Sequence, residues 1–254
     1  MKVQTGTRRA MALVLAFCLA ALAGAVAADK KEKTKPEASQ TVDAGAFGVF
    51  IKEQRVATET FTIEQKNGTS IIKSHLKATA GQESASQKSD LEITPSGELL
   101  RYEWSQSSGG SLSVFPNNDF LKETITASAS SKPAEQAFLM PSTSAILDNN
   151  FFIHREVLIW RYLAADCKPV NGNLQCPKEP ANFGALVPQD RNSLSVRLEL
   201  VGKEKVAIRG AERELLRLNL TGENFEWALW VDENDHFKLI KVAIPADNTE
   251  VVRD

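Results

Sequence analysis

The chain has 254 residues, of which 43% are hydrophobic and 24% are charged, and its formal net charge is −2. These values are typical of a globular protein. They exclude a mostly disordered chain, a collagen-like fibre, a multi-span membrane protein and a small disulfide-dense domain, but they do not indicate a particular activity.

The first 27 residues have the pattern of a secretory signal peptide. Arg8 and Arg9 form a positive segment, an apolar run follows, and Ala25–Ala27 supplies the small residues of a cleavage site. The apolar run is short for a membrane span. We therefore expect cleavage near Ala27 and a periplasmic or secreted mature chain without a membrane span. Lipidation at Cys18 and a retained N-terminal anchor are the alternatives.

The mature chain is expected to form one domain. Residues 28–43 are polar and charged, which is typical of a disordered tether, and we expect the folded domain over residues 44–254. Cleavage would remove three basic residues and no acidic one. The resulting acidic chain has no basic cluster in its folded part, which argues against nucleic acid as a partner.

Alternation of apolar and polar residues dominates the expected domain. This period of two is typical of strands with one buried face. A clear example runs from Leu194 to Leu200, and Asn67–Gly68 is a strong signal of a hairpin turn between two such segments. We expect antiparallel meanders before and after a different middle segment.

The middle segment predicts one long helix, at about residues 144–165. Its apolar residues occupy most of the helical circumference, so the helix must be covered on several sides. A flat sheet covers one side only. We therefore expect a mainly β (α+β) fold, in which one large curved antiparallel sheet or open barrel of about ten to thirteen strands wraps the helix.

Cys167 and Cys176 flank a loop that is rich in turn-forming residues. Two cysteines are too few for a structural zinc site, and their spacing is not that of a redox motif. In an oxidising compartment we expect them to form a disulfide.

Catalytic and metal-binding motifs are missing from the sequence. His75, His154 and His236 share no metal-ligand spacing, and the acidic turn at residues 232–235 lacks the spacing of a calcium loop. No nucleophile elbow or phosphate-binding loop occurs. We expect no enzyme activity, cofactor or metal, although a triad assembled from distant residues stays open.

Aromatic residues suggest an apolar space between the helix and the sheet. Such clefts are lined by aromatic and aliphatic side chains, and ordinary core packing is the alternative. The candidate pocket residues are Phe151, Leu158, Trp160, Trp227 and Trp230.

Two segments resemble a known group of proteins. The segment FGVFIKEQRVATETFTIEQ and the closing segment WALWVDENDHFKLIKVAIPADNTEVVRD resemble the first and last hairpins of uncharacterised exported bacterial β proteins of the DUF3108 type. Trp230, Asp232 and Lys238 carry the Trp-x-Asp turn and the following lysine. The fold of those families is similar to that of Lol-type lipoprotein carriers, which implies binding of an acyl chain or a scaffold role in the cell envelope.

The sequence leads to two principal hypotheses about function. The first is an exported, non-enzymatic binder or carrier of a lipidic or otherwise apolar ligand. The alternative is a cell-envelope protein-interaction or assembly module with a filled core and no ligand. An enzyme would be a third possibility if one of the histidines met carboxylates or serines in a cleft.

Overall fold

A computed structural model describes residues 39–79, 86–171 and 173–254. The expected signal peptide lies outside these residues. The first strand begins at Gln40, so the sheet includes the last part of the expected tether. Asp43 in this segment is buried against Arg253, and the ion pair explains why a polar stretch is part of the sheet.

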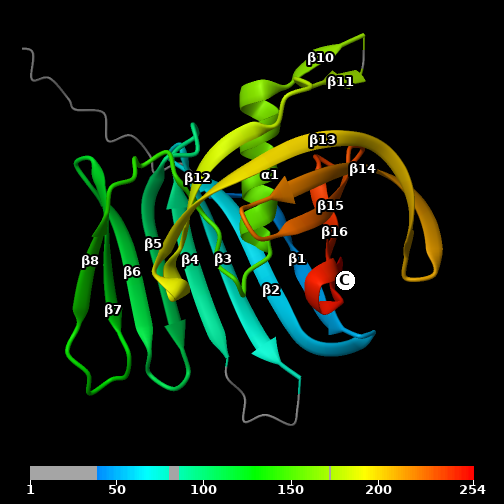
Figure 1. The fold of residues 1–254 in the computed structure, drawn as a ribbon. Helices are drawn as coiled ribbons and strands as arrows, with labels where there is room; N and C mark the ends of the chain where they lie inside the picture. Colours follow the sequence, from blue (N-terminus) through cyan, green and yellow to red (C-terminus); the bar gives the residue numbers. More distant parts are fainter. Residues whose placement is uncertain (1–38, 80–85, 172) are drawn as a thin grey trace, which may run out of the picture. The chain divides into compact units, whose positions relative to one another are not determined.

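One large, mostly antiparallel sheet dominates the described residues (Figure 1). Its fifteen strands, in spatial order, are β8 (Ala134–Phe138), β7 (Phe120–Thr126), β6 (Ser111–Asn117), β5 (Leu99–Gln106), β4 (Gln87–Ile93), β3 (Thr69–Ala78), β2 (Gln54–Lys66), β1 (Gln40–Ile51), β17 (Thr249–Arg253), β16 (Lys238–Ile244), β15 (Glu226–Asp232), β14 (Ala211–Thr221), β13 (Asn192–Ile208), β12 (Ala181–Val187) and β9 (Ala145–Ile146). The remaining elements are the helix α1 (Ile153–Asp166), the hairpin β10 (Lys168–Val170) and β11 (Asn173–Gln175), and the 3-10 turns η1 (Pro188–Asp190) and η2 (Pro245–Asp247).

The sheet consists of two meanders that meet at β1 and β17. Strands β1 to β8 follow one another outward on one side, and β17 back to β12 do so on the other. The two meet through antiparallel pairing of Phe47–Ile51 with Thr249–Arg253. The edges at β8 and β9 are not paired with each other among the described strands, so the sheet is open. The expectation of a curved sheet is thus confirmed, with more strands than expected.

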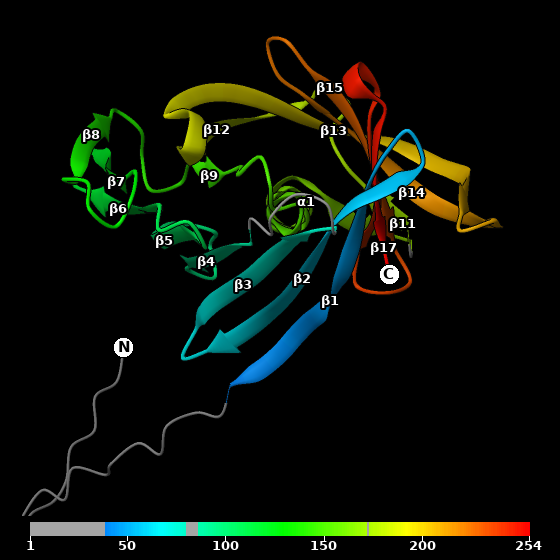
Figure 2. The same ribbon diagram turned by 90° about the horizontal axis from the view of Figure 1, so that it is seen from below.

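The strands of the two meanders lie on different sides of α1 (Figure 2). Eight of its fourteen residues are buried, as the all-round apolar pattern predicts. Most of the buried apolar side chains form a single core between α1 and the sheet. The expected enclosure of the helix is therefore confirmed.

The helix begins at Ile153, not at residue 144 as predicted. The preceding segment is extended instead, because β9 pairs in parallel with Ala185 and Leu186 of β12. The Asp148 carboxylate then accepts the backbone N–H of Asn150 and so stabilises a turn. Tertiary pairing thus replaces the first turns of the predicted helix.

Candidate functional site

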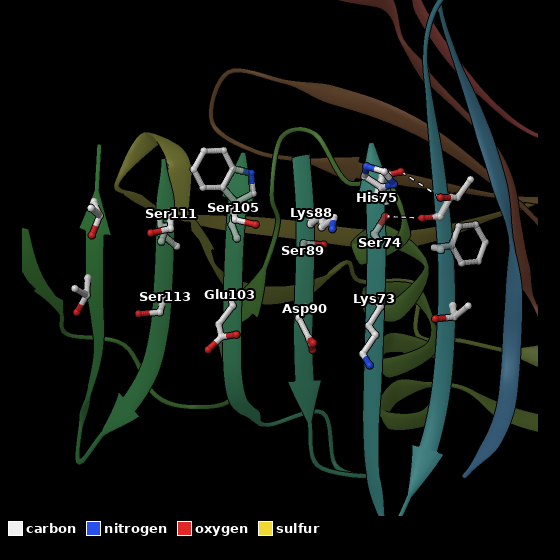
Figure 3. Close-up of a pocket in the computed structure, with 17 residues that line it drawn as sticks. Lys73, Ser74, His75, Lys88, Ser89, Asp90, Glu103, Ser105, Ser111 and Ser113 are labelled. Atoms are coloured by element: carbon white, nitrogen blue, oxygen red, sulfur yellow. Dashed lines mark hydrogen bonds between the residues drawn. The ribbon is translucent and has the colours of Figure 1, made fainter. Parts of the chain in front are cut away.

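The face of strands β2–β7 that points away from α1 contains a hollow of about 690 Å³ (Figure 3). Alternation along the strands creates this face: Phe61 and Ile63 are buried in the core, whereas Thr60 and Thr62 point outward. We call it the outer hollow. Its volume lies within the range of ligand-binding clefts.

The outer hollow is formed by two rows of polar side chains in register across six strands. The first row is Thr60, His75, Lys88, Ser105, Ser111 and Thr126, and the second is Thr62, Lys73, Asp90, Glu103, Ser113 and Thr124. Adjacent strands lie about 4.8 Å apart, so each row extends over roughly 24 Å. This length suits an extended ligand that crosses the strands.

Arg101 lies close to three acidic side chains on the outer face of the sheet. Its guanidinium lies 2.7 Å from Glu92, 2.9 Å from Glu103 and 3.9 Å from Asp90. The hydrogen bond to Glu92 raises the pKa of Arg101. Burial raises the pKa of Asp90, against the opposing effect of Arg101 and Lys73. Glu92 and Glu103 are therefore paired closely with Arg101, whereas the Asp90 Oδ1 atom is buried without a hydrogen-bond partner in the described residues.

The basic groups on β3 and β4 are arranged differently. Within the described residues, Lys77 and Lys88 make no ion pair, and His75 lies beside both. Burial, then the charges of Lys77 and Lys88, lower the pKa of His75. The His75 Nε2 atom is shut off from solvent and has no hydrogen-bond partner in the described part of the chain.

The residues of the predicted apolar pocket make contacts with other parts of the protein. Phe151 and Leu158 are buried, Trp160 donates its indole N–H to the Phe237 carbonyl at 3.1 Å, and the Arg155 guanidinium lies 4.8 Å from the centre of the Trp227 ring. The cavity lined by Leu158 in this region has a volume of about 30 Å³. That is far below the roughly 300 Å³ of the smallest drug-sized ligand pockets.

Trp230 lies apart from Leu158, Trp160 and Trp227, which belong to the main core or pack against it. It belongs to a separate small cluster with Ile208, Leu215 and Ile240. Its indole N–H donates to the Glu204 carboxylate at 3.0 Å. The cause is strand alternation, because Trp230 and Leu229 point to opposite faces of β15, and Leu229 belongs to the main core.

Buried polar groups surround the N-terminus of α1, and the sequence pattern does not reveal them. The Glu59 carboxylate accepts the backbone N–H groups of Phe152 and Ile153, at 2.7 and 3.3 Å, and the Ser74 hydroxyl. A carboxylate at a helix N-terminus also interacts favourably with the helix dipole. Burial nevertheless raises the pKa of Glu59 to about 7.

A second buried group lies on the other side of this helix end. Asp148 accepts hydrogen bonds from the Tyr102 hydroxyl and the Gln189 amide. Arg155 donates to the carbonyls of Asp148 and Phe151. Tyr102, Asp148 and Arg155 are buried and Gln189 is partly buried, so we assign this group to the support of α1.

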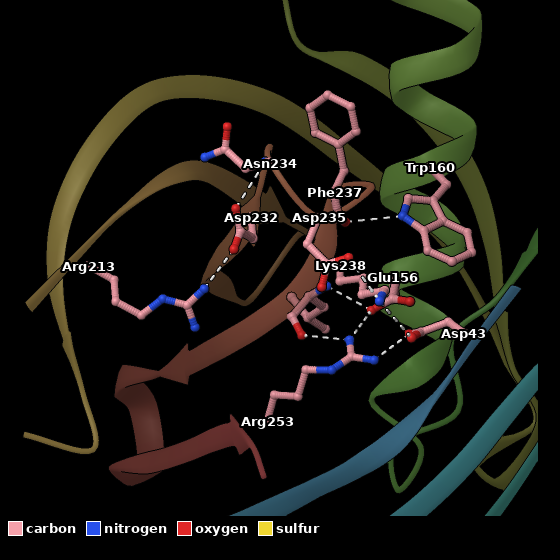
Figure 4. Close-up of polar contacts among 11 residues, drawn as sticks. Asp43, Glu156, Trp160, Arg213, Asp232, Asn234, Asp235, Phe237, Lys238 and Arg253 are labelled. Carbon is pink, nitrogen blue, oxygen red and sulfur yellow. Dashed lines mark hydrogen bonds and ion pairs between the residues drawn. The ribbon is translucent and has the colours of Figure 1, made fainter. Parts of the chain in front are cut away.

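A third polar group joins α1 to the meeting point of the two meanders (Figure 4). Arg253 donates to Glu156 on the helix at 3.1 Å and also pairs with Asp43 on β1. Lys238 lies 3.5 Å from Asp43. Burial and the nearby Asp43 raise the pKa of Glu156.

The three histidines lie on different elements. His75 is on β3, His154 on α1 and His236 at the turn before β16. His154 is almost fully buried; desolvation, then Arg155, lower its pKa to about 3. Among the described residues no group of three His, Cys, Asp or Glu side chains is placed to hold a metal ion.

The predicted disulfide between Cys167 and Cys176 is confirmed. It closes the hairpin of β10 and β11, directly after α1. The turn-rich loop between the two cysteines therefore sufficed to predict this pairing.

Comparisons with protein-family models, curated proteins and solved structures gave no match to this chain. The resemblance to DUF3108-type families therefore stays a prediction. No helix of the described residues combines the length and the apolar character needed to cross a membrane.

Proposed function

We propose that this protein is an exported, non-enzymatic interaction module of the cell envelope, which binds a protein partner through the outer hollow. The observation that supports this most is the contrast between two spaces of the fold. The cavity beside α1 measures about 30 Å³, whereas the outer hollow measures about 690 Å³. The cavity beside α1 is too small for an acyl chain, but an extended polar segment fits across β2–β7.

The chemistry of the outer hollow supports a polar partner. Its lining includes many Ser and Thr hydroxyls and several charged groups beside the apolar Phe61, Trp104 and Leu112, and hydroxyls both donate and accept hydrogen bonds. A partner segment that crosses the strands can therefore exchange hydrogen bonds along its whole length. Export of the protein is supported by the N-terminal sequence alone.

A photo-crosslinking residue at Ser113, on the floor of the outer hollow, tests the proposed function in cells that express the protein natively. We expect one dominant protein adduct from this position. The matched control places the same residue at the exposed Lys205 of β13 in the other meander, where no adduct is expected. Equal crosslinking at both positions, or none at Ser113, would count against the outer hollow as the binding face.

A fluorescent C16 fatty acid tests the competing carrier hypothesis. Because the cavity beside α1 is so small, we expect no saturable binding to the purified mature protein. Saturable binding that Leu158→Trp abolishes would instead support an apolar carrier and contradict our proposal.

A further inference from the structure

One group of cations at the outer hollow has no counter-ion among the residues that the structure describes. We call His75, Lys77 and Lys88 the cationic corner. His75 and Lys77 are two residues apart on β3 and so point to the same face, and Lys88 is the direct cross-strand partner of His75 on β4. Like charges placed this close in a sheet destabilise it. A bound anion would offset this repulsion.

The acidic groups of the outer hollow have a cation close by within the protein. Arg101 pairs with three carboxylates. Lys73 makes no ion pair among the described residues, but it faces Asp90 across the strands and opposes the rise in the pKa of Asp90. No acidic side chain among the described residues is within ion-pair distance of Lys77 or Lys88. Within the described residues, the corner is thus the place on this face where two lysines lack an acidic cross-strand partner.

The His75 imidazole provides a second, independent observation. Its Nε2 atom is buried and lacks a partner in the described residues, although buried polar atoms normally have one. On β2 the neighbouring group is the Thr60 hydroxyl, which donates to the His75 carbonyl at 3.4 Å and not to the ring. Because His75 lines the hollow, a turn of the imidazole toward this space brings the ring nitrogen to a ligand group.

We propose that the cationic corner is an anion site, which takes a carboxylate of an acidic peptide segment of the partner. This inference rests on the proposed function, because it names the chemistry of the partner. The carboxylate lies between the two ammonium groups and receives a hydrogen bond from the protonated His75 ring. Binding is therefore linked to the uptake of a proton from solvent.

The direction of the pH dependence follows from the groups that face His75. Lys77 on its own strand and Lys88 on β4 both oppose its protonation, and β2 contributes only the neutral Thr60 hydroxyl. A bound carboxylate places a negative charge beside the ring, which opposes the effect of the two lysines and favours the protonated form of His75. Affinity should therefore rise as pH falls from about 7.5 to about 5.5, by at most about tenfold per pH unit for one proton.

Isothermal titration of the mature protein with a hexaglutamate peptide tests the site. Hexaserine and inorganic phosphate are the comparison probes. We expect saturable one-to-one binding of hexaglutamate, and weakening by about tenfold in Lys88→Gln and in Lys77→Gln, as the loss of one charge-assisted contact implies. Lys205→Gln removes the same charge from an exposed site in the other meander and should leave the affinity unchanged.

The variant His75→Gln tests whether the imidazole contacts the bound carboxylate or only supports the fold. The glutamine keeps a hydrogen-bonding side chain on a half-buried strand position but cannot titrate near neutral pH. We expect binding of hexaglutamate at pH 7.5 close to that of the wild type, and no tightening at pH 5.5. A variant that retains the full pH dependence would overturn the role given to His75.

The remaining outcomes distinguish this inference from the proposed function. Equal weakening by Lys205→Gln would show that only net charge matters and would overturn the site. Phosphate that binds as tightly as hexaglutamate would overturn the assignment to a carboxylate. Hexaserine binding without preference for hexaglutamate, together with the Ser113 adduct, would overturn the anion site and leave the proposed function standing.

Discussion

At the scale of single residues, the interior of this protein is unusual because it contains several charged or titratable side chains. Arg155, Glu156 and His154 follow one another on the buried first turn of α1, and all three are within the core. Such groups are costly to bury unless they are hydrogen-bonded or paired. Arg155 and Glu156 have such partners, whereas neither ring nitrogen of His154 has one among the described residues.

His154→Phe should stabilise the protein most at acidic pH. The folded state holds the pKa of His154 at about 3, below its ordinary value of 6.5, so the unfolded state binds the extra proton. The wild type therefore loses stability as pH falls below about 6.5. At pH 5 the variant should gain about 2 kcal/mol in the free energy of unfolding, measured by urea denaturation.

The control for this prediction is the same measurement at pH 8, where His154 is neutral in both states. The gain should be smaller there. The Tyr102 ring, which meets His154 edge-on at 5.7 Å, can make the same contact with phenylalanine. An equal gain at both pH values would contradict the argument from protonation.

Glu59→Gln should change the pH profile in the opposite sense. The folded state raises the pKa of Glu59 from 4.5 to about 7, so here the folded state binds more protons than the unfolded one. The wild-type contribution falls as pH rises from about 4.5 to about 7. As pH rises across this window, the free energy of unfolding of the variant should therefore increase relative to that of the wild type, as measured by thermal melts. A pH-independent difference would show that Glu59 titrates normally.

At the scale of elements, the disulfide hairpin after α1 should stabilise the fold by restricting the unfolded chain. The bridge spans nine positions in the sequence, and the chain-entropy model gives about 2–3 kcal/mol for such a loop. Replacing Cys167 and Cys176 together by serine should lower the free energy of unfolding by this amount. Adding a reductant to the wild type should have the same effect, and none on the double variant.

Some elements could be predicted because their signals are local. The Asn67–Gly68 turn has positive φ at both residues, as the dipeptide indicates, and the strands follow from their alternation. The start of α1 could not be predicted in this way. Its N-terminal N–H groups are capped by Glu59, a residue from a strand far away in the sequence, so no nearby capping residue marks the position.

The outer hollow was not predicted either, for a related reason. Lys73, Asp90 and Glu103 each read as a solvated strand position in the sequence. Only the register of the neighbouring strands places them in one row, and register depends on pairings between separate hairpins. The apolar pocket, in contrast, was inferred from residue type alone, which cannot tell an empty space from a packed one.

At the scale of the whole molecule, Arg253 connects the two meanders and the helix. Arg253→Met would leave Glu156 buried without its cation and Asp43 with Lys238 alone. Breaking a buried pair costs about 3–5 kcal/mol, so we expect a loss of this size in urea denaturation. Arg213→Met is the matched control, because its pair with Asp232 is more exposed and should be worth about 1 kcal/mol or less.

Similar losses in both variants would contradict the central role given to Arg253. The comparison is informative because each variant removes one guanidinium from a carboxylate contact in the same half of the sheet. Arg253 pairs with two carboxylates and Arg213 with one, so the difference between the variants reports burial together with the second ion pair.

The pairing of β1 with β17 also has a consequence for the order of assembly. Asp43 and Arg253, which lie at this seam, are 210 positions apart in the sequence, whereas each meander is built from neighbouring hairpins. Local hairpins form in microseconds, but closing so long a loop is slow. Each meander can therefore form early, whereas the pairing of β1 with β17 forms last, after synthesis has reached β17.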